Sequence, residues 1–149
     1  MKKHLVHIAA TLTILVAVGI TASAQITRTM TVTVPFDFHI GKTALPAGTY
    51  TVYDTRTQSG DGFLMADNDG GPRVFFIAQP VKTGKTRSVA RLDFRRYNDK
   101  YFLTRIWSAG SNIGRELQQS DLERDVAKTG ERNVARKASK PESVTITSE

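Results

Sequence analysis

The sequence predicts an all-β fold, an antiparallel sandwich or small barrel of about six to eight short strands, with one short C-terminal helix and a disordered tail. Three observations support this prediction. The first two are short stretches in which polar and apolar residues alternate, and clusters of Gly, Pro, Asn and Asp between these stretches. A third is that no helical stretch separates the strands, whereas parallel α/β folds need crossover helices. The 149 residues suit one domain.

The first strands follow from period-2 alternation. Residues 29–34 alternate small polar with apolar side chains, the pattern of a half-buried strand. Pro35 ends or bends this strand, because proline has no N–H to donate to a central ladder. Residues 36–40 resume the alternation, and a turn containing Pro and Gly over 41–48 leads into another strand at 49–53.

Later strands are expected at 63–66 and 73–78, on either side of a turn rich in Asp, Asn and Gly. The strongest hairpin signal joins residues 88–97 to residues 100–107. The two residues between these arms are Asn and Asp, which tolerate the left-handed backbone of a tight turn.

The C-terminal region changes character. Ser120 and Glu123 match a helix capping box, in which the two side chains satisfy free amides of the first turn, so we expect a helix near 120–129 that Gly130 ends. Residues 131–149 are polar and charged and are expected to form a disordered tail. The apolar residues expected to pack this helix against the sheet are Leu122 and Val126, and the alternative for the tail is an edge strand over Val144–Ile146.

The N-terminus is typical of an exported protein. Two lysines precede an apolar run over residues 5–20, and small residues lead up to Ala24. We therefore expect residues 1–24 to be a secretory signal peptide cleaved after Ala24, which places residues 25–130 in a single β-rich domain of the periplasm or cell exterior. An uncleaved anchor is the alternative, but about 16 residues fall short of the roughly 20 that span a bilayer, and no transmembrane segment is expected after cleavage.

Positive charge is concentrated in one stretch. Residues 82–105 hold eight basic and two acidic residues, a net charge of +6. In the strand that this stretch contains, arginines alternate with the apolar residues expected in the core, so Arg87, Arg91 and Arg95 are the candidate polyanion-contact residues. The expected partners are anionic glycans, lipid headgroups or an envelope protein, not a specific nucleic acid. The alternative is a stripe of arginines that is merely solvated.

The sequence lacks the residues that several kinds of catalytic and metal site require. The chain has no cysteine, which excludes disulfides, thiolate metal sites and thiol nucleophiles. His39 is the only histidine beyond the predicted signal peptide, so no histidine-rich metal site is available, and no cofactor is expected. An oxygen cage for calcium near Asp67 lacks the required ligand spacing. We expect a non-enzymatic binding or structural component; the alternatives are a small barrel carrying an apolar ligand and, less favoured, a small hydrolase using His39 with Asp37.

Five sequence blocks resemble those of a known protein family. They are Val34–Gly41 (VPFDFHIG), Leu45–Val52 (LPAGTYTV), Leu92–Phe94 (LDF), Tyr101–Trp107 (YFLTRIW) and Gly114–Leu117 (GREL). In this order they are similar to small secreted proteins abundant in some soil bacteria. That family has no established activity, so the resemblance implies secretion but no site residue. The LPAGTY block alone also resembles a turn in carboxypeptidase regulatory-like sandwich domains.

Overall fold

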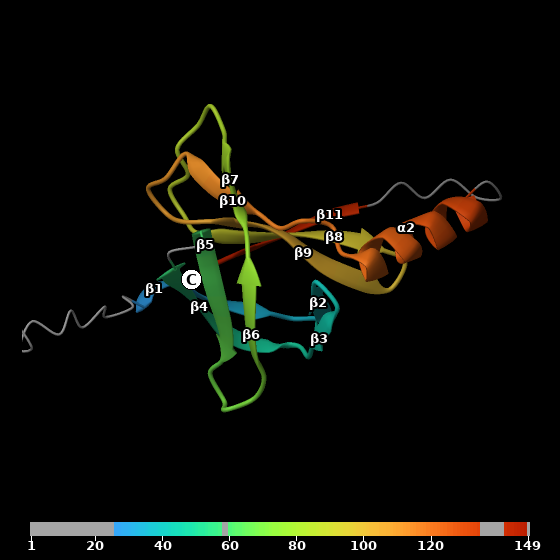
Figure 1. Ribbon diagram of the computed structural model, residues 1–149, viewed down its shortest axis with the longest axis horizontal. Coiled ribbons are helices and arrows are strands. Elements are labelled where there is room, and N and C mark those ends of the chain that lie inside the picture. The colour runs from blue at the N-terminus through green and yellow to red at the C-terminus, as the bar shows by residue number, and fades with distance from the viewer. Residues whose placement is uncertain (1–25, 58–59, 135–141, 149) are drawn as a thin grey trace, which may run out of the picture.

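The computed structural model describes residues 26–57, 60–134 and 142–148, which form eleven strands and one helix (Figure 1). The predicted signal peptide lies outside the described residues. One sheet has four antiparallel strands in the order β1-β4-β5-β6. Its strands are β1 (Ile26–Val34), β4 (Gly48–Thr57), β5 (Gly60–Asp67) and β6 (Arg73–Ile77).

The second sheet has seven strands and follows the order β11-β8-β9-β10-β7. A short pair, β2 and β3, joins this sheet through parallel pairing of β2 with the start of β9, while β10 pairs with the end of β9. Its strands are β2 (Phe38–Ile40), β3 (Thr43–Leu45), β7 (Gln79–Lys82), β8 (Arg91–Tyr97), β9 (Lys100–Trp107), β10 (Ile113–Glu116) and β11 (Glu142–Thr147).

The two sheets bury a shared apolar core, as expected for a sandwich. Aromatic rings fill its centre: the Phe38 ring lies edge-on to Tyr50, with 5.3 Å between centroids, and to Phe94, at 5.4 Å. The apolar-carrier alternative required such rings to line a cavity, whereas these rings contact one another. Further core residues are Met30, Val32, Val34, Ile40, Leu45, Val52, Phe63, Met65, Leu92, Leu103 and Ile106.

The first two sequence blocks of the resemblance meet in space. The Asp37 carboxylate accepts a hydrogen bond from the Ala47 amide at 2.9 Å, and the Tyr50 hydroxyl donates to the Pro46 carbonyl at 2.7 Å. Together with the Phe38–Tyr50 ring contact, these bonds fix the turn between β3 and β4. The residues of these blocks therefore perform a structural role.

The predicted β8–β9 hairpin is confirmed. Asn98 has φ of 52°, the left-handed conformation expected at this turn, and Tyr97 pairs with Lys100 across it. A bulge between Asp93 and Phe94 interrupts the alternation, so both of these neighbouring residues are buried. This bulge was not visible in the sequence.

The helix α2 (Asp121–Val134) begins as predicted, because the Ser120 hydroxyl accepts a hydrogen bond from the Glu123 amide at 3.1 Å. The other half of the capping box is not formed: the Glu123 side chain contacts β8 instead, and it is the most buried residue of the described helix face. The predicted end at Gly130 is wrong, since the helix continues to Val134. Leu122 is half-buried, as predicted for the packed face, and so is Val126.

The predicted disordered tail over residues 131–149 is wrong for residues 131–134, which belong to α2, and for residues 142–147, which form β11, while residues 135–141 lie outside the described residues. The alternative edge strand is present, because β11 pairs antiparallel with β8 from Glu142 opposite Arg96 to Thr147 opposite Arg91. Val144 and Ile146 pack on the core from this strand. Pairing with a distant strand and burial of two apolar side chains outweighed the polar composition of the segment.

Candidate functional site

The three arginines chosen from the sequence do not form one continuous group. Arg91 and Arg95 lie on β8, and Arg87 lies in the connection between β7 and β8. The guanidinium carbons of Arg87 and Arg91 are 4.4 Å and 5.7 Å from the centroid of the Trp107 ring, so both cations cover the same indole. Arg95 belongs to a different cluster, beneath the start of α2.

A buried carboxylate, Asp93, organises the Arg91 cluster. Asp93 is 7% exposed and accepts hydrogen bonds from the Trp107 indole N–H at 2.7 Å and from the Thr145 hydroxyl at 3.1 Å. It also pairs with Arg91, whose Nη2 lies 3.2 Å from Asp93 Oδ2. Asp93 therefore fixes both the indole and the guanidinium above it. The sequence suggested neither role.

Arg95 is engaged by a carboxylate from the helix. Its Nη1 lies 3.4 Å from Glu123 Oε1, which also accepts a hydrogen bond from the Tyr97 hydroxyl at 3.2 Å. Burial raises the pKa of the Glu123 carboxyl above its usual value, although the positive charge of Arg95 opposes this shift. Arg95 is thus part of the contact between helix and sheet.

Two arginines in the second half of the basic stretch are paired with acids from elsewhere in the chain. Arg96 pairs with Glu142 of β11 at 3.2 Å. Arg105 places Nη2 2.8 Å and Nε 3.1 Å from one oxygen of Glu116 on β10. Among the described residues of the stretch, the basic side chains without an ion pair are Lys82, Lys85 and Arg87 in the first half and Lys100 at the start of β9.

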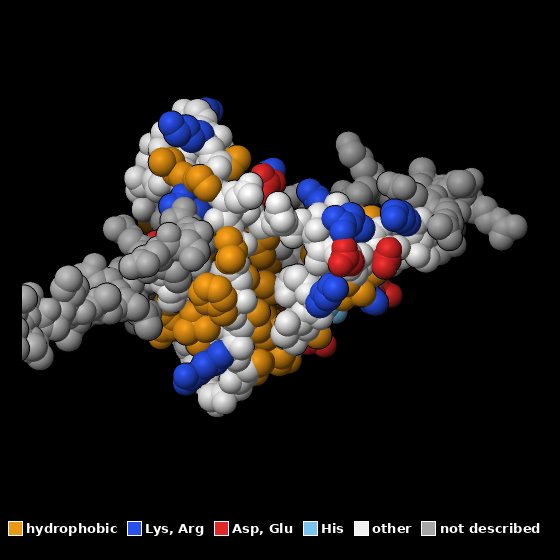
Figure 2. Space-filling view, in the orientation of Figure 1, with side chains coloured by type: hydrophobic (Ala, Val, Ile, Leu, Met, Phe, Trp, Pro, Cys, Tyr) orange, Lys and Arg blue, Asp and Glu red, His pale blue; other side chains and the backbone are white. Residues whose placement is uncertain are grey.

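That first half forms a projecting lobe, composed of residues 79–91 and 107–115 and called the basic lobe below (Figures 1 and 2). Three backbone hydrogen bonds fix the connection before β8 to the turn before β10, from Thr83 N to Asn112 O, from Arg87 N to Ser111 O and from Gly110 N to Arg87 O. The lobe contains no acidic residue and five basic ones: Lys82, Lys85, Arg87, Arg91 and Arg115.

Among the described residues, Lys82, Lys85 and Arg87 form no ion pair. Lys82 and Lys85 are exposed, and Figure 2 shows basic side chains at the tip of the lobe. We had not selected the two lysines from the sequence. The signal that identifies them is the absence of acidic residues between 79 and 92.

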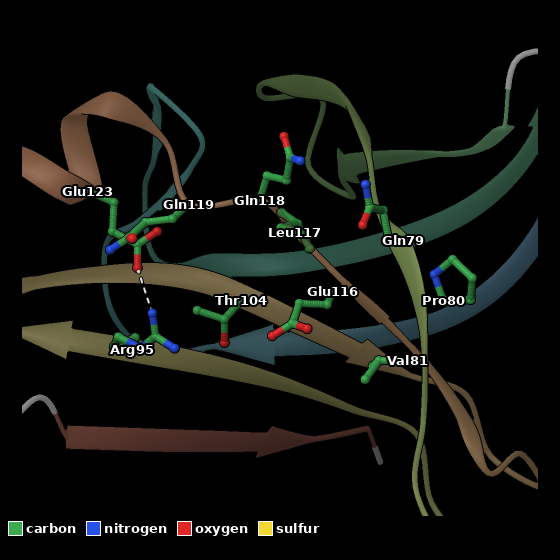
Figure 3. A pocket seen from close by; sticks show the side chains of 10 residues that line it. All are labelled: Gln79, Pro80, Val81, Arg95, Thr104, Glu116, Leu117, Gln118, Gln119 and Glu123. Atoms are coloured by element: carbon green, nitrogen blue, oxygen red, sulfur yellow. Dashed lines mark hydrogen bonds and ion pairs between the residues drawn. The ribbon is translucent and has the colours of Figure 1, made fainter.

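A pocket of about 330 Å³ lies at the base of the lobe, on the outer face of the larger sheet (Figure 3). Arg95, Thr104 and Glu116 lie on the sheet beneath it, and Glu123 and Gln119 border it where α2 begins. Gln119 donates to the Tyr97 hydroxyl at 3.3 Å. The remaining lining residues are Gln79, Pro80, Val81, Leu117 and Gln118.

His39 and Asp37 do not form a catalytic pair. Asp37 accepts a backbone hydrogen bond from Ala47, and His39 Nδ1 has no hydrogen-bond partner among the described residues. The imidazole stacks on Phe102, 5.0 Å between centroids, and burial lowers its pKa below the usual value. Neither residue lines the pocket at the base of the lobe. This arrangement gives the hydrolase alternative no support.

An exposed apolar patch lies on the outer face of the four-stranded sheet (Figure 2). Phe75 and Ile77 on β6 are 54% and 63% exposed, and β6 is the last strand of its sheet. The Phe75 ring covers Gly62 of β5, where a Cβ would lie 2.7 Å from the ring.

No family model, curated protein or solved structure matches this chain. Within the part of the chain that the structure describes, no helix has the length and apolar character to cross a bilayer. The fold and the surface together define a β-sandwich domain with a basic lobe and an adjacent polar pocket.

Proposed function

We propose that the protein is an exported, non-enzymatic binding domain of the cell envelope whose basic lobe contacts anionic polymers or lipid headgroups. The observation that carries the proposal is the group of three cations, Lys82, Lys85 and Arg87, on a lobe without any acidic residue. Their charge is available to a partner because no carboxylate of the described chain neutralises it. Such a local excess attracts polyanions and accelerates their association.

The lobe is built to keep these cations in place. Arg87 lies over the ring of Trp107, which is itself anchored by its hydrogen bond to Asp93. A guanidinium whose position is already fixed loses less conformational entropy when an anion binds. Arg91 adds a second guanidinium over the same ring. The expected function therefore depends on Lys82, Lys85 and Arg87, because Arg91 and Arg95 are each paired with a carboxylate.

Binding of the purified chain 25–149 to anionic polymers and anionic vesicles tests the proposal. Neutralising Lys82, Lys85 and Arg87 with glutamine should weaken binding about a hundredfold, since each cation near an anionic surface contributes about 1 kcal/mol. It should also flatten the salt dependence of the affinity.

A matched variant replaces three exposed lysines outside the lobe, Lys42, Lys100 and Lys128, and lowers the net charge equally. This control should bind like the unchanged protein. If both triple variants lose affinity equally, only net charge matters and the lobe has no special role. If the unchanged protein binds no polyanion, the proposal is wrong.

Export is tested separately by the mass of the protein recovered from the cell envelope. The expected mass is that of a chain beginning at Gln25. Recovery of the full-length chain would contradict the predicted cleavage.

A further inference from the structure

The pocket at the base of the basic lobe adjoins the proposed polyanion surface along strand β7. Gln79, Pro80 and Val81 of β7 line the pocket, and the next residue, Lys82, is the first cation of the lobe. A polymer lying on the lobe can therefore also reach the pocket. The pocket's chemistry then bears on which kind of polymer binds.

Charge within the pocket is balanced. Glu123 is paired with Arg95, and Glu116 is paired with Arg105, which does not itself line the pocket. An anionic group entering the pocket would meet two carboxylates, and a cation would meet Arg95. An apolar ligand would leave these charged groups without water and without a replacement partner, which is costly. The pocket therefore favours a neutral, polar ligand.

The lining groups also specify the hydrogen bonds that such a ligand must make. The carboxylates are acceptors, the guanidinium is a donor, and the Gln79 and Gln118 amides are both. Hydroxyl groups donate and accept, so a ring bearing several of them can satisfy all of these groups at once. Pro80, Val81 and Leu117 supply apolar surface for the C–H groups of such a ring.

The polar groups of the pocket are already oriented. Arg95 is fixed by Glu123, and Glu116 receives two hydrogen bonds from Arg105 through the same oxygen. Figure 3 shows Glu123 and Gln119 on the α2 side of the pocket and Gln79 and Gln118 on the opposite side. At about 330 Å³ the pocket is at the small end of the range for ligand sites, which suits a single ring.

We infer that this pocket binds one uncharged sugar residue of an acidic polysaccharide, and that the anionic groups of neighbouring residues contact the basic lobe. The inference rests on the proposed function and narrows it from anionic polymers in general to glycans. It distinguishes glycans from polyanions of equal charge that carry no hydroxyl-bearing ring.

The test compares three polysaccharides in which uncharged sugar residues adjoin uronate residues (hyaluronate, unsulfated chondroitin and gellan) with polyacrylate, which carries carboxylates but no sugar rings. Vesicles containing phosphatidylglycerol form a further arm. Calorimetry on the chain 25–149 at about 0.15 M salt, where charge attraction is screened, should give at least one polysaccharide an affinity about tenfold above that of polyacrylate. Equal affinities for all carboxylate polymers, or preference for the vesicles, would overturn the inference.

Two uncharged substitutions separate the pocket from the lobe. Gln79→Ala with Gln118→Ala should lower the affinity for the preferred polysaccharide about tenfold and leave that for polyacrylate unchanged, because two amide hydrogen bonds are lost without any change of charge. Thr43→Ala, an exposed site on β3, is the matched control and should alter neither. A double variant that binds every polymer like the unchanged protein would refute the pocket's role.

Failure of the two proposals can be told apart. If the lobe triple variant loses affinity for all polymers equally while the pocket variant keeps its affinity for each of them, the lobe proposal stands and the inference of a sugar-binding pocket is wrong. If the lobe variant retains full affinity for every polymer, the proposed function itself is wrong.

Discussion

Replacing Asp93 with asparagine removes one negative charge from the centre of the outer sheet face while keeping the shape of the side chain. Three donors converge on this carboxylate: the Trp107 indole, the Thr145 hydroxyl and the Arg91 guanidinium. Asparagine offers one acceptor oxygen in place of two. Arg91 contacts both oxygens, Oδ1 through Nε and Oδ2 through Nη2, so the amide group of asparagine must face one guanidinium N–H, donor against donor.

The structure sets the size of the effect. A hydrogen bond to a charged group contributes about 1.5–3 kcal/mol, and breaking a fully buried ion pair costs about 3–5 kcal/mol. Arg91 keeps 24% of its side-chain surface exposed, so water compensates part of its lost partner. We expect Asp93→Asn to lower the free energy of unfolding by about 2–4 kcal/mol, or roughly 10 °C in the unfolding midpoint.

Urea unfolding followed by tryptophan fluorescence is the natural assay, because Trp107 is the only tryptophan and donates directly to Asp93. Asp99→Asn, in the exposed β8–β9 turn, is the control and should change stability little. A loss below about 1 kcal/mol for Asp93→Asn would refute the view that this carboxylate organises the cluster.

Three other predictions concern single sites. Gly114→Ala should destabilise the fold by about 1–3 kcal/mol, because its Cβ would lie 2.5 Å from the Trp107 ring, whereas Gly84→Ala meets no atom within 4 Å and should be neutral; equal urea midpoints for the two would contradict this packing. Burial lowers the folded-state pKa of His39, so the unfolded state binds more protons and the free energy of unfolding should fall as pH falls through about 6.5. In the chain 25–149, His39→Gln should remove this pH dependence. An NMR titration that gives the imidazole a pKa at or above 6.5 would disprove the prediction. Burial raises the folded-state pKa of Glu123, so the free energy of unfolding should fall as pH rises from about 4.5 through the folded-state pKa. The urea midpoint of Glu123→Gln should not show this fall. Parallel pH profiles for the variant and the unchanged protein would contradict the prediction.

The strand alternation predicted the fold class because burial in a sandwich imposes period 2. Thr31 and Thr33 lie between the buried Met30, Val32 and Val34 as that rule requires. The rule does not identify short, mostly polar strands. These are β7 and β11 at the edges of the larger sheet and β10 between β9 and β7, and their pairing depends on partners that a local pattern does not contain. Such strands therefore account for much of what was missed.

The candidate site was harder to predict for a related reason. The sequence shows that Arg95, Arg96 and Arg105 are basic, but their partners lie 28, 46 and 11 residues further along the chain. The fold determines which of these cations are paired with a carboxylate. Of the lobe's cations, the sequence singles out Arg87 and Arg91 but not Lys82 and Lys85. The absence of acidic residues between 79 and 92 marks the two lysines, and their projection from the sandwich required the structure.

Strand β11 has a consequence for how the protein must be made. β8 meets β9 as soon as the hairpin is synthesised, but its other edge pairs with residues made some 46 positions after Arg96. Until those residues emerge, β8 is an open edge that presents Phe94 and Leu92 beside an unfilled part of the core. A chain exported in an extended state would close its sandwich only after nearly all of it has crossed the membrane. During that interval, the unpaired edge of β8 would be the preferred binding site for a holdase chaperone on the far side of the membrane.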